Sequence, residues 1–189
     1  MKQLAIEGIN GSGKTPALVI AKDLLANAGI SSDTYAAYHL VRDKIEEPDS
    51  FDLWADRPEQ AVALLHETLN EIEADARARN LDVLLFDRHW LTAYTQAETN
   101  PEIITMWGDR HVPTVLFTSP SHHLTRLAER GYPHEWLQAE SLEYYRQLYD
   151  QLYERYAKHF LGRFTVASST QDLAPIAHQL VTLIKTMEE

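Results

Sequence analysis

Eight consecutive residues near the amino terminus have the types and spacing of a phosphate-binding loop. The run Gly8-Ile9-Asn10-Gly11-Ser12-Gly13-Lys14-Thr15 satisfies every fixed position of the pattern G-x-x-x-x-G-K-[ST]. Glycines let the backbone turn its N–H groups toward a phosphate, Lys14 brings positive charge to the β- and γ-phosphate oxygens, and the Thr15 hydroxyl suits Mg²⁺. The loop therefore predicts binding of ATP, or another nucleoside triphosphate, together with Mg²⁺.

A carboxylate, Asp87, follows the apolar run of residues 81–86. Parallel sheets bind ligands at the carboxyl ends of their strands, so Asp87 is expected beside the phosphate-binding loop. It could orient Mg²⁺ through water, accept a proton from a phosphate acceptor, or only cap the turn that follows.

Strand-like and helix-like segments alternate along the chain, which predicts where these groups are held. Strands are expected at 3–8, 32–38, 82–86, 114–118 and 164–167, and helices at 15–28, 59–80, 120–130, 139–160 and 173–187. Segments 40–57 and 131–136 break the pattern and are interpreted as mobile or ligand-covering elements. The alternation predicts an α/β protein: a parallel five-stranded sheet in a three-layer α/β/α P-loop kinase fold.

Composition limits the classes of partner. A length of 189 residues favours one domain over 1–189, and 44% hydrophobic residues without a long apolar run predict a soluble protein that spans no membrane. A net charge of −11 argues against nucleic acid as a partner, and the absence of cysteine excludes disulfides and thiolate metal sites. Without a visible secretory signal, a cytoplasmic location is expected. A homodimer is compatible with the sequence, which leaves the oligomeric state open.

Several short motifs, in order, resemble the thymidylate kinase family of nucleoside monophosphate kinases. Residues 5–15 are similar to that family's F-E-G-I-D-G-S-G-K-T opening. Further along, Ala55-Asp56-Arg57 resembles its A-D-R element, Asp87-Arg88-His89 its D-R-Y element, and Ala93-Tyr94 its A-Y-Q element. Residues 126–131 and 140–145 are similar to the family's lid and to the helix after it.

The resemblance implies transfer of the γ-phosphoryl group of ATP to a nucleoside monophosphate, with thymidine monophosphate as the leading acceptor. It places Lys14, Asp87 and Arg88 in catalysis, with Asp87 also serving the metal alongside Thr15. Carried over by position, the remaining site residues are Arg57 and Arg88 on the acceptor phosphate, Trp54 and Tyr94 near the acceptor, Arg126 and Arg130 on a lid at about 126–140, and Ser168 near the adenine.

Departures from the family pattern fall mainly on the acceptor side. Asn10 stands where many members have aspartate, residues 38–42 replace the R-E-P-G-G-T segment, and Leu53 replaces an aromatic residue. The lid motif D-R-x-E is also replaced, by residues 134–137. Two alternatives therefore stay open: a kinase of the same fold acting on another nucleotide, a nucleoside or a small metabolite, and a nucleotide-binding regulator without catalysis.

Overall fold

The computed structural model describes residues 1–45, 53–54, 56–98, 100–119, 139–167 and 172–187. Five parallel strands form one sheet in the order β2-β3-β1-β4-β5. Their bounds are Lys2–Glu7 (β1), Ser32–Tyr35 (β2), Val83–Asp87 (β3), Thr114–Thr118 (β4) and Phe160–Thr165 (β5). No described helix is both long and apolar enough to cross a bilayer.

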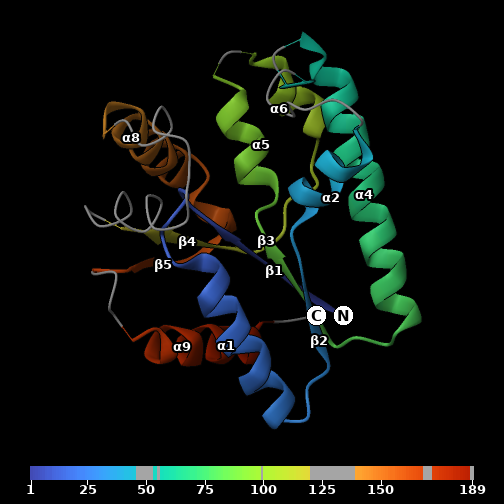
Figure 1. Cartoon of the computed structure of the whole chain (residues 1–189), viewed down its shortest axis with the longest axis vertical. Coiled ribbons are helices and arrows are strands. Elements are labelled where there is room, and N and C mark those ends of the chain that lie inside the picture. The colour runs from blue at the N-terminus through green and yellow to red at the C-terminus, as the bar shows by residue number, and fades with distance from the viewer. Residues whose placement is uncertain (46–52, 55, 99, 120–138, 168–171, 188–189) are drawn as a thin grey trace.

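Helices cover both faces of the sheet (Figure 1). One face packs against α1 (Lys14–Asn27) and α9 (Ala174–Thr186). The other packs against α2 (Ala37–Lys44), α4 (Pro58–Ala78), α5 (Trp90–Gln96), α6 (Glu102–Trp107) and α8 (Ala139–Arg155). This arrangement confirms the predicted three-layer α/β/α architecture.

Alternation along the central strands explains the two layers of core. In β1, Leu4 and Ile6 pack toward α1 and α9, whereas Ala5 faces the opposite helices. In β3, Leu85 and Phe86 divide between the two faces in the same way. Successive side chains of a strand point to opposite faces, so strands covered on both sides must be apolar throughout. This requirement explains why the strands appear in the sequence as short apolar runs.

The chain reverses its direction of winding at β1, and this places the candidate site. In the sheet, β3 and β2 lie on one side of β1, and the later strands β4 and β5 lie on its other side. Open α/β sheets bind ligands at such a point, outside the carboxyl ends of the strands. Glu7, Asp87 and Thr118 end the three strands that meet there.

The predicted bounds were wrong at the last strand. A helix was expected over 139–160, but α8 ends at Arg155, a short 3-10 helix (Ala157–His159) follows, and β5 already begins at Phe160. Tyr156 and Phe160 continue the helical spacing of α8, yet exposure alternates along the whole of β5, which is strand behaviour. Pairing with β4 therefore prevailed over the helical pattern.

Other differences concern helices. The segment 40–57 was expected to be irregular, but its first described part belongs to α2. The two short helices α5 and α6 were not predicted. The helix expected at 120–130, the irregular segment 131–136 and residues 126–138 of the expected lid lie outside the described residues.

Candidate functional site

The phosphate-binding loop joins β1 to α1 and depends on glycine at its first position. Gly8, Gly11 and Gly13 have φ angles of 134°, 77° and 91°, which side-chain-bearing residues rarely adopt. At Gly8 an added Cβ would lie 2.1 Å from the backbone oxygen of Phe117 in β4. The loop can therefore pass this close to the neighbouring strand only if Gly8 lacks a side chain.

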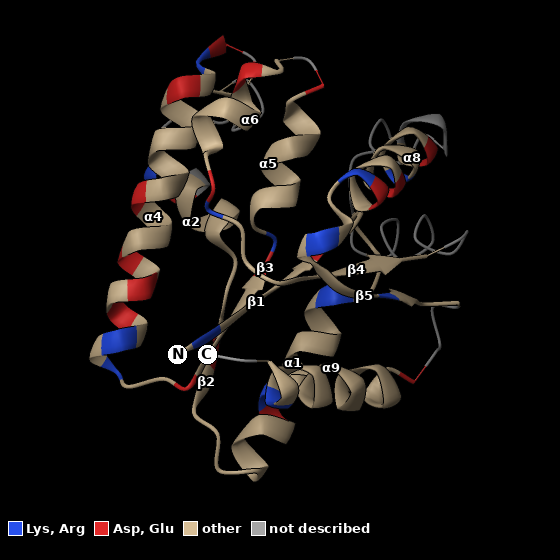
Figure 2. Ribbon diagram, turned by 180° about the vertical axis from the view of Figure 1, so that it is seen from behind, with Lys and Arg blue, Asp and Glu red and all other residues tan. Residues whose placement is uncertain are grey.

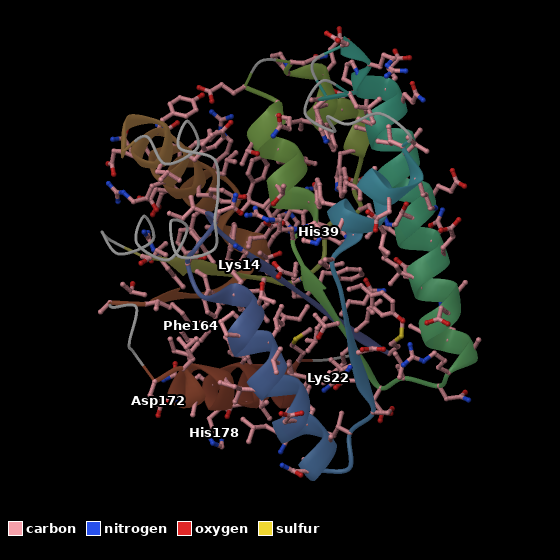
Figure 3. All side chains as sticks on the ribbon, in the orientation of Figure 1. Lys14, Lys22, His39, Phe164, Asp172 and His178 are labelled. Atoms are coloured by element: carbon pink, nitrogen blue, oxygen red, sulfur yellow. The ribbon has the colours of Figure 1, made fainter. Side chains whose placement is uncertain are left out.

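Lys14 begins α1 at the carboxyl edge of the sheet (Figure 3). The side chain is buried, and its Nζ donates hydrogen bonds to the backbone oxygens of Gly8 and Ile9, each at 2.9 Å. The ammonium group thus lies over the loop it belongs to. In this position it is within reach of a phosphate cradled by the loop's N–H groups.

Thr15 and Asp87 meet across the gap between α1 and β3. The Thr15 hydroxyl donates a hydrogen bond to Asp87 Oδ2 at 2.6 Å. A hydroxyl and a carboxylate are hard oxygen donors, and Mg²⁺ is commonly held by such groups together with phosphate oxygens. The two residues predicted to serve Mg²⁺ are therefore in contact, and their chemistry fits that ion.

Arg88 follows Asp87 and has an unusual backbone conformation, with φ of 77°. Positive φ is uncommon for a residue other than glycine and persists only where the surroundings hold it. Its Nη2 donates to Asn10 Oδ1 at 2.6 Å, and its Nη1 donates to Tyr149 OH at 2.9 Å and to Thr92 Oγ1 at 3.1 Å. The guanidinium is thereby fixed between the phosphate-binding loop, α5 and α8.

The surroundings of Arg88 keep it charged. Burial lowers the pKa of the Arg88 guanidinium, but interactions with Tyr149, Glu7 and Asp87 outweigh burial, and the pKa is raised. Figure 2 shows basic residues at the start of α1 and between β3 and α5, beside the acidic end of β3. A fixed positive charge next to a hydroxyl–carboxylate pair suits binding of anionic phosphate oxygens.

A cleft joins these groups. Its walls come from the phosphate-binding loop and the start of α1, from the segment leading into α2, and from the end of β3. The residues that line it are Asn10, Gly11, Gly13, Lys14, Thr15, Pro16, Ala36, Tyr38, His39, Asp87 and Arg88. The structure therefore brings most of the predicted phosphate-binding loop together with Asp87 and Arg88 around one space.

Ser12 of the loop is not among the residues that line this space. It is fully buried, and its hydroxyl has no hydrogen-bond partner among the described residues. A buried hydroxyl without a partner is costly, so a ligand oxygen that reached it would be stabilised.

Of the residues predicted for the acceptor side, Arg88 lines the cleft, whereas Trp54, Arg57 and Tyr94 do not. Trp54 is buried, and its ring stacks against that of Tyr38 at a centroid distance of 6.1 Å. Arg57 is exposed at the start of α4. Tyr94 is buried, and its hydroxyl lies 2.9 Å from His111 Nε2. Arg126, Arg130 and Ser168 lie outside the described residues.

Four residues near the site were not among the predicted site residues, although two of them belong to the altered acceptor-side segment 38–42. Tyr38 and His39 line the cleft from the start of α2, as Figure 3 shows for His39. Glu7 and Tyr149 lie behind it, around Arg88. A charged residue ending an apolar strand was an available signal for Glu7. Nothing in the local pattern distinguished Tyr149 from the core positions of its helix.

Comparisons with known proteins agree with this fold. No protein-family model matches the chain, and no curated protein matches it. A solved structure of a deoxyadenosine kinase from M. mycoides, with the products dCMP and a flexible dCDP bound, is similar with a TM-score of 0.54 and 17% sequence identity. The match covers 98% of this chain and 100% of that one. The described part of the chain therefore has the same fold as that kinase.

Proposed function

We propose that this protein transfers the γ-phosphoryl group of ATP, with Mg²⁺, to the phosphate of a nucleoside monophosphate. The observation that carries the proposal is the position of Arg88. Its guanidinium is bonded to Asn10 of the phosphate-binding loop, and it directly follows Asp87, which contacts Thr15. A charge fixed beside the place of the γ-phosphate can hold a second phosphate for attack.

On the donor side, Lys14 leaves the carbonyl oxygens of the loop and binds the β- and γ-phosphate oxygens. Thr15 and Asp87 would hold Mg²⁺, which would neutralise negative charge on the transferring group when bound. An oxygen of the acceptor phosphate forms a bond to the γ-phosphorus while the bond to the β-phosphate oxygen breaks, and ADP leaves. Arg88 stabilises the negative charge shared by the two phosphates.

The side chains able to act as a base bear on the acceptor class. A hydroxyl acceptor must lose a proton, whereas a phosphate monoester is already largely anionic at neutral pH. Among the described residues that line the cleft, Asp87 is the single carboxylate, and it is bonded to Thr15. Asn10 cannot accept a proton. His39, which also lines the cleft, is a side chain that can accept a proton, so the need for a base does not exclude a hydroxyl acceptor. The preference for a phosphate acceptor rests on the fixed charge of Arg88, and the choice of thymidine monophosphate rests on the sequence resemblance.

A nucleoside acceptor is the second candidate. The similar solved structure is named a deoxyadenosine kinase, and its bound products are the nucleotides dCMP and dCDP, of which dCMP is a phosphorylated nucleoside. A nucleotide-binding regulator without turnover is a third candidate, supported by Asn10 in place of the family's aspartate. These candidates differ in the acceptor that stimulates ATP consumption.

The test is Mg²⁺-dependent ATP consumption across nucleoside monophosphates, nucleosides and no acceptor. Lys14→Ala is expected to lower turnover by about 100-fold or more, because the phosphates lose a buried positive charge. The matched control is Lys22→Ala on the same helix, farther from the cleft (Figure 3), where Lys22 pairs with Asp33 at 2.5 Å. The control is expected to retain activity.

Turnover with a monophosphate that is lost only in Lys14→Ala supports the proposal. Turnover with nucleosides alone would move the protein to the second candidate. Binding of ATP without stimulation by any acceptor would contradict a kinase activity.

A further inference from the structure

Glu7 is a fully buried carboxylate at the end of β1, directly before the phosphate-binding loop. Burial raises the pKa of Glu7, although hydrogen bonds and the nearby Arg88 charge oppose that effect. A buried carboxylate is costly, so its retention requires well-placed donors. Glu7 lies behind the cleft rather than on its wall, and the proposed reaction gives it no direct part.

Three hydrogen bonds converge on Glu7 from the start of α5. Its Oε1 accepts from the backbone N–H of His89 at 2.6 Å and from that of Thr92 at 3.2 Å. Its Oε2 accepts from the Thr92 hydroxyl at 2.6 Å. Because an ionised carboxylate can only accept, the Thr92 proton must point to Glu7.

This direction sets the orientation of Arg88. With its proton given to Glu7, the Thr92 oxygen presents its lone pairs outward, and Arg88 Nη1 donates to it at 3.1 Å. Tyr149 OH lies 3.1 Å from the same oxygen and also accepts from Nη1. Glu7 is thus connected to the guanidinium through the Thr92 hydroxyl.

Two residues of β1, Ile6 and Glu7, hold the backbone around Arg88. The Arg88 N–H donates to the backbone oxygen of Ile6 at 3.1 Å, and the next N–H, of His89, donates to Glu7. These two bonds flank the residue with positive φ. A conformation that is unfavourable in isolation is maintained where such contacts over-determine it.

We propose that Glu7 is a positioning residue, which acts through Thr92 to hold Arg88 in the orientation that binds the acceptor phosphate. This inference rests on the proposed function for the identity of the ligand. The orientation of the Arg88 side chain can also be measured in the absence of substrate.

The first test compares two Thr→Val variants on α5. Thr92→Val removes the hydroxyl between Glu7 and Arg88, whereas Thr95→Val removes one that bonds only within the helix, to Thr92 O at 2.7 Å. Thr92→Val is expected to raise the acceptor KM about tenfold, the size of one lost hydrogen bond to a charged group. The ATP KM is expected to change less than about twofold, since the phosphate-binding loop is untouched.

Thr92→Ser keeps the hydroxyl and loses the methyl group, and it is expected to have the acceptor KM of the wild-type protein. If Thr92 acted only through packing, loss of the methyl group would raise the acceptor KM in Thr92→Ser as well. Glu7→Gln probes the direction of the bonds. Its amide must place a donor either against the two backbone N–H groups or against the Thr92 oxygen, where it competes with Arg88. It is expected to raise the acceptor KM at least as much as Thr92→Val.

The second test measures the Arg88 guanidinium by side-chain ¹⁵N NMR, without substrate. Slow rotation is expected in the wild-type protein and in Thr95→Val, because Arg88 is held at three points, and faster rotation is expected in Thr92→Val. If Thr92→Val rotates as slowly as Thr95→Val, the inference is overturned. If rotation changes as expected but no acceptor supports turnover, the positioning role stands and the proposed function fails.

Discussion

Thr15 and Asp87 are 72 residues apart in the sequence, yet the threonine hydroxyl lies 2.6 Å from a carboxylate oxygen of the aspartate. Thr15 belongs to the first turn of α1, and Asp87 ends β3, the strand next to β1. The contact is made possible by the parallel pairing of β1 with β3, in which Ile6 lies opposite Asp87. Strand register therefore brings the two oxygen groups together.

Asp87→Asn is expected to weaken Mg²⁺ binding at this pair, because the neutral amide removes the negative charge that attracts the cation. The Mg²⁺ concentration for half-maximal activity should rise about tenfold, and kcat should fall by about 100-fold. Titration of activity with Mg²⁺ measures both. The matched control is Asp82→Asn at the opposite end of the strand, where Asp82 bonds to Ser31 at 2.7 Å.

Titration of activity with Mg²⁺ and, separately, with the acceptor distinguishes the roles open to Asp87. A change in the acceptor KM with unaltered Mg²⁺ dependence would assign the carboxylate to the acceptor instead of the metal. Wild-type kinetics in Asp87→Asn would leave it only as the cap of a turn.

Gly8→Ala is expected to destabilise the protein by about 3 kcal/mol or more, since the new Cβ would overlap a backbone oxygen that cannot rotate away. Urea denaturation measures the free energy of unfolding. Gly29→Ala is an informative control, because Gly29 has φ of 73° but open space around it, and should cost about 1 kcal/mol. Gly162→Ala, in open space without positive φ, should be nearly neutral.

An equal loss of stability in Gly8→Ala and Gly29→Ala would show that backbone conformation alone matters at the loop. The close approach of the loop to β4 would then have no energetic importance.

The parts of the site that could be predicted are local in the sequence. Eight consecutive residues define the phosphate-binding loop, and Asp87 is identified by its position directly after an apolar strand. Both statements need only the geometry of one strand and one turn. The five-stranded parallel sheet was predicted from the alternation of short apolar runs with helical segments. Strands that are covered by helices on both faces must be apolar along their length, which explains the apolar runs.

The contacts of Arg88 could not be predicted in this way. Its partners Asn10 and Tyr149 are 78 and 61 residues distant, and the relevant atoms are the ends of side chains. Nothing in the sequence indicates that Tyr149 is buried with its hydroxyl at a charged group, as the structure shows. Trp54 illustrates the converse, because an aromatic residue near Arg57 suggested an acceptor contact, and the structure buries it behind Tyr38.

His89 predicts a dependence of stability on pH. Burial lowers the pKa of His89 to about 3, with Arg110, His66 and His111 adding to the effect, from an ordinary value of 6.5. Between these values the unfolded chain binds a proton that the folded protein does not, so stability is lost as pH falls below about 6.5. At pH 5 the loss from this residue is about 2 kcal/mol relative to pH 7.5.

His89→Phe is expected to remove that loss, because the buried ring, packed edge-on against Phe86 and Trp107, no longer titrates. Urea denaturation at pH 7.5 and pH 5 measures it, with His178→Gln, at an exposed position on α9, as the control. Burial raises the pKa of Glu7, which acts in the opposite direction in every variant, so only the difference from wild type is read. If His89→Phe loses as much stability on acidification as the wild-type protein, the acid sensitivity belongs to other groups.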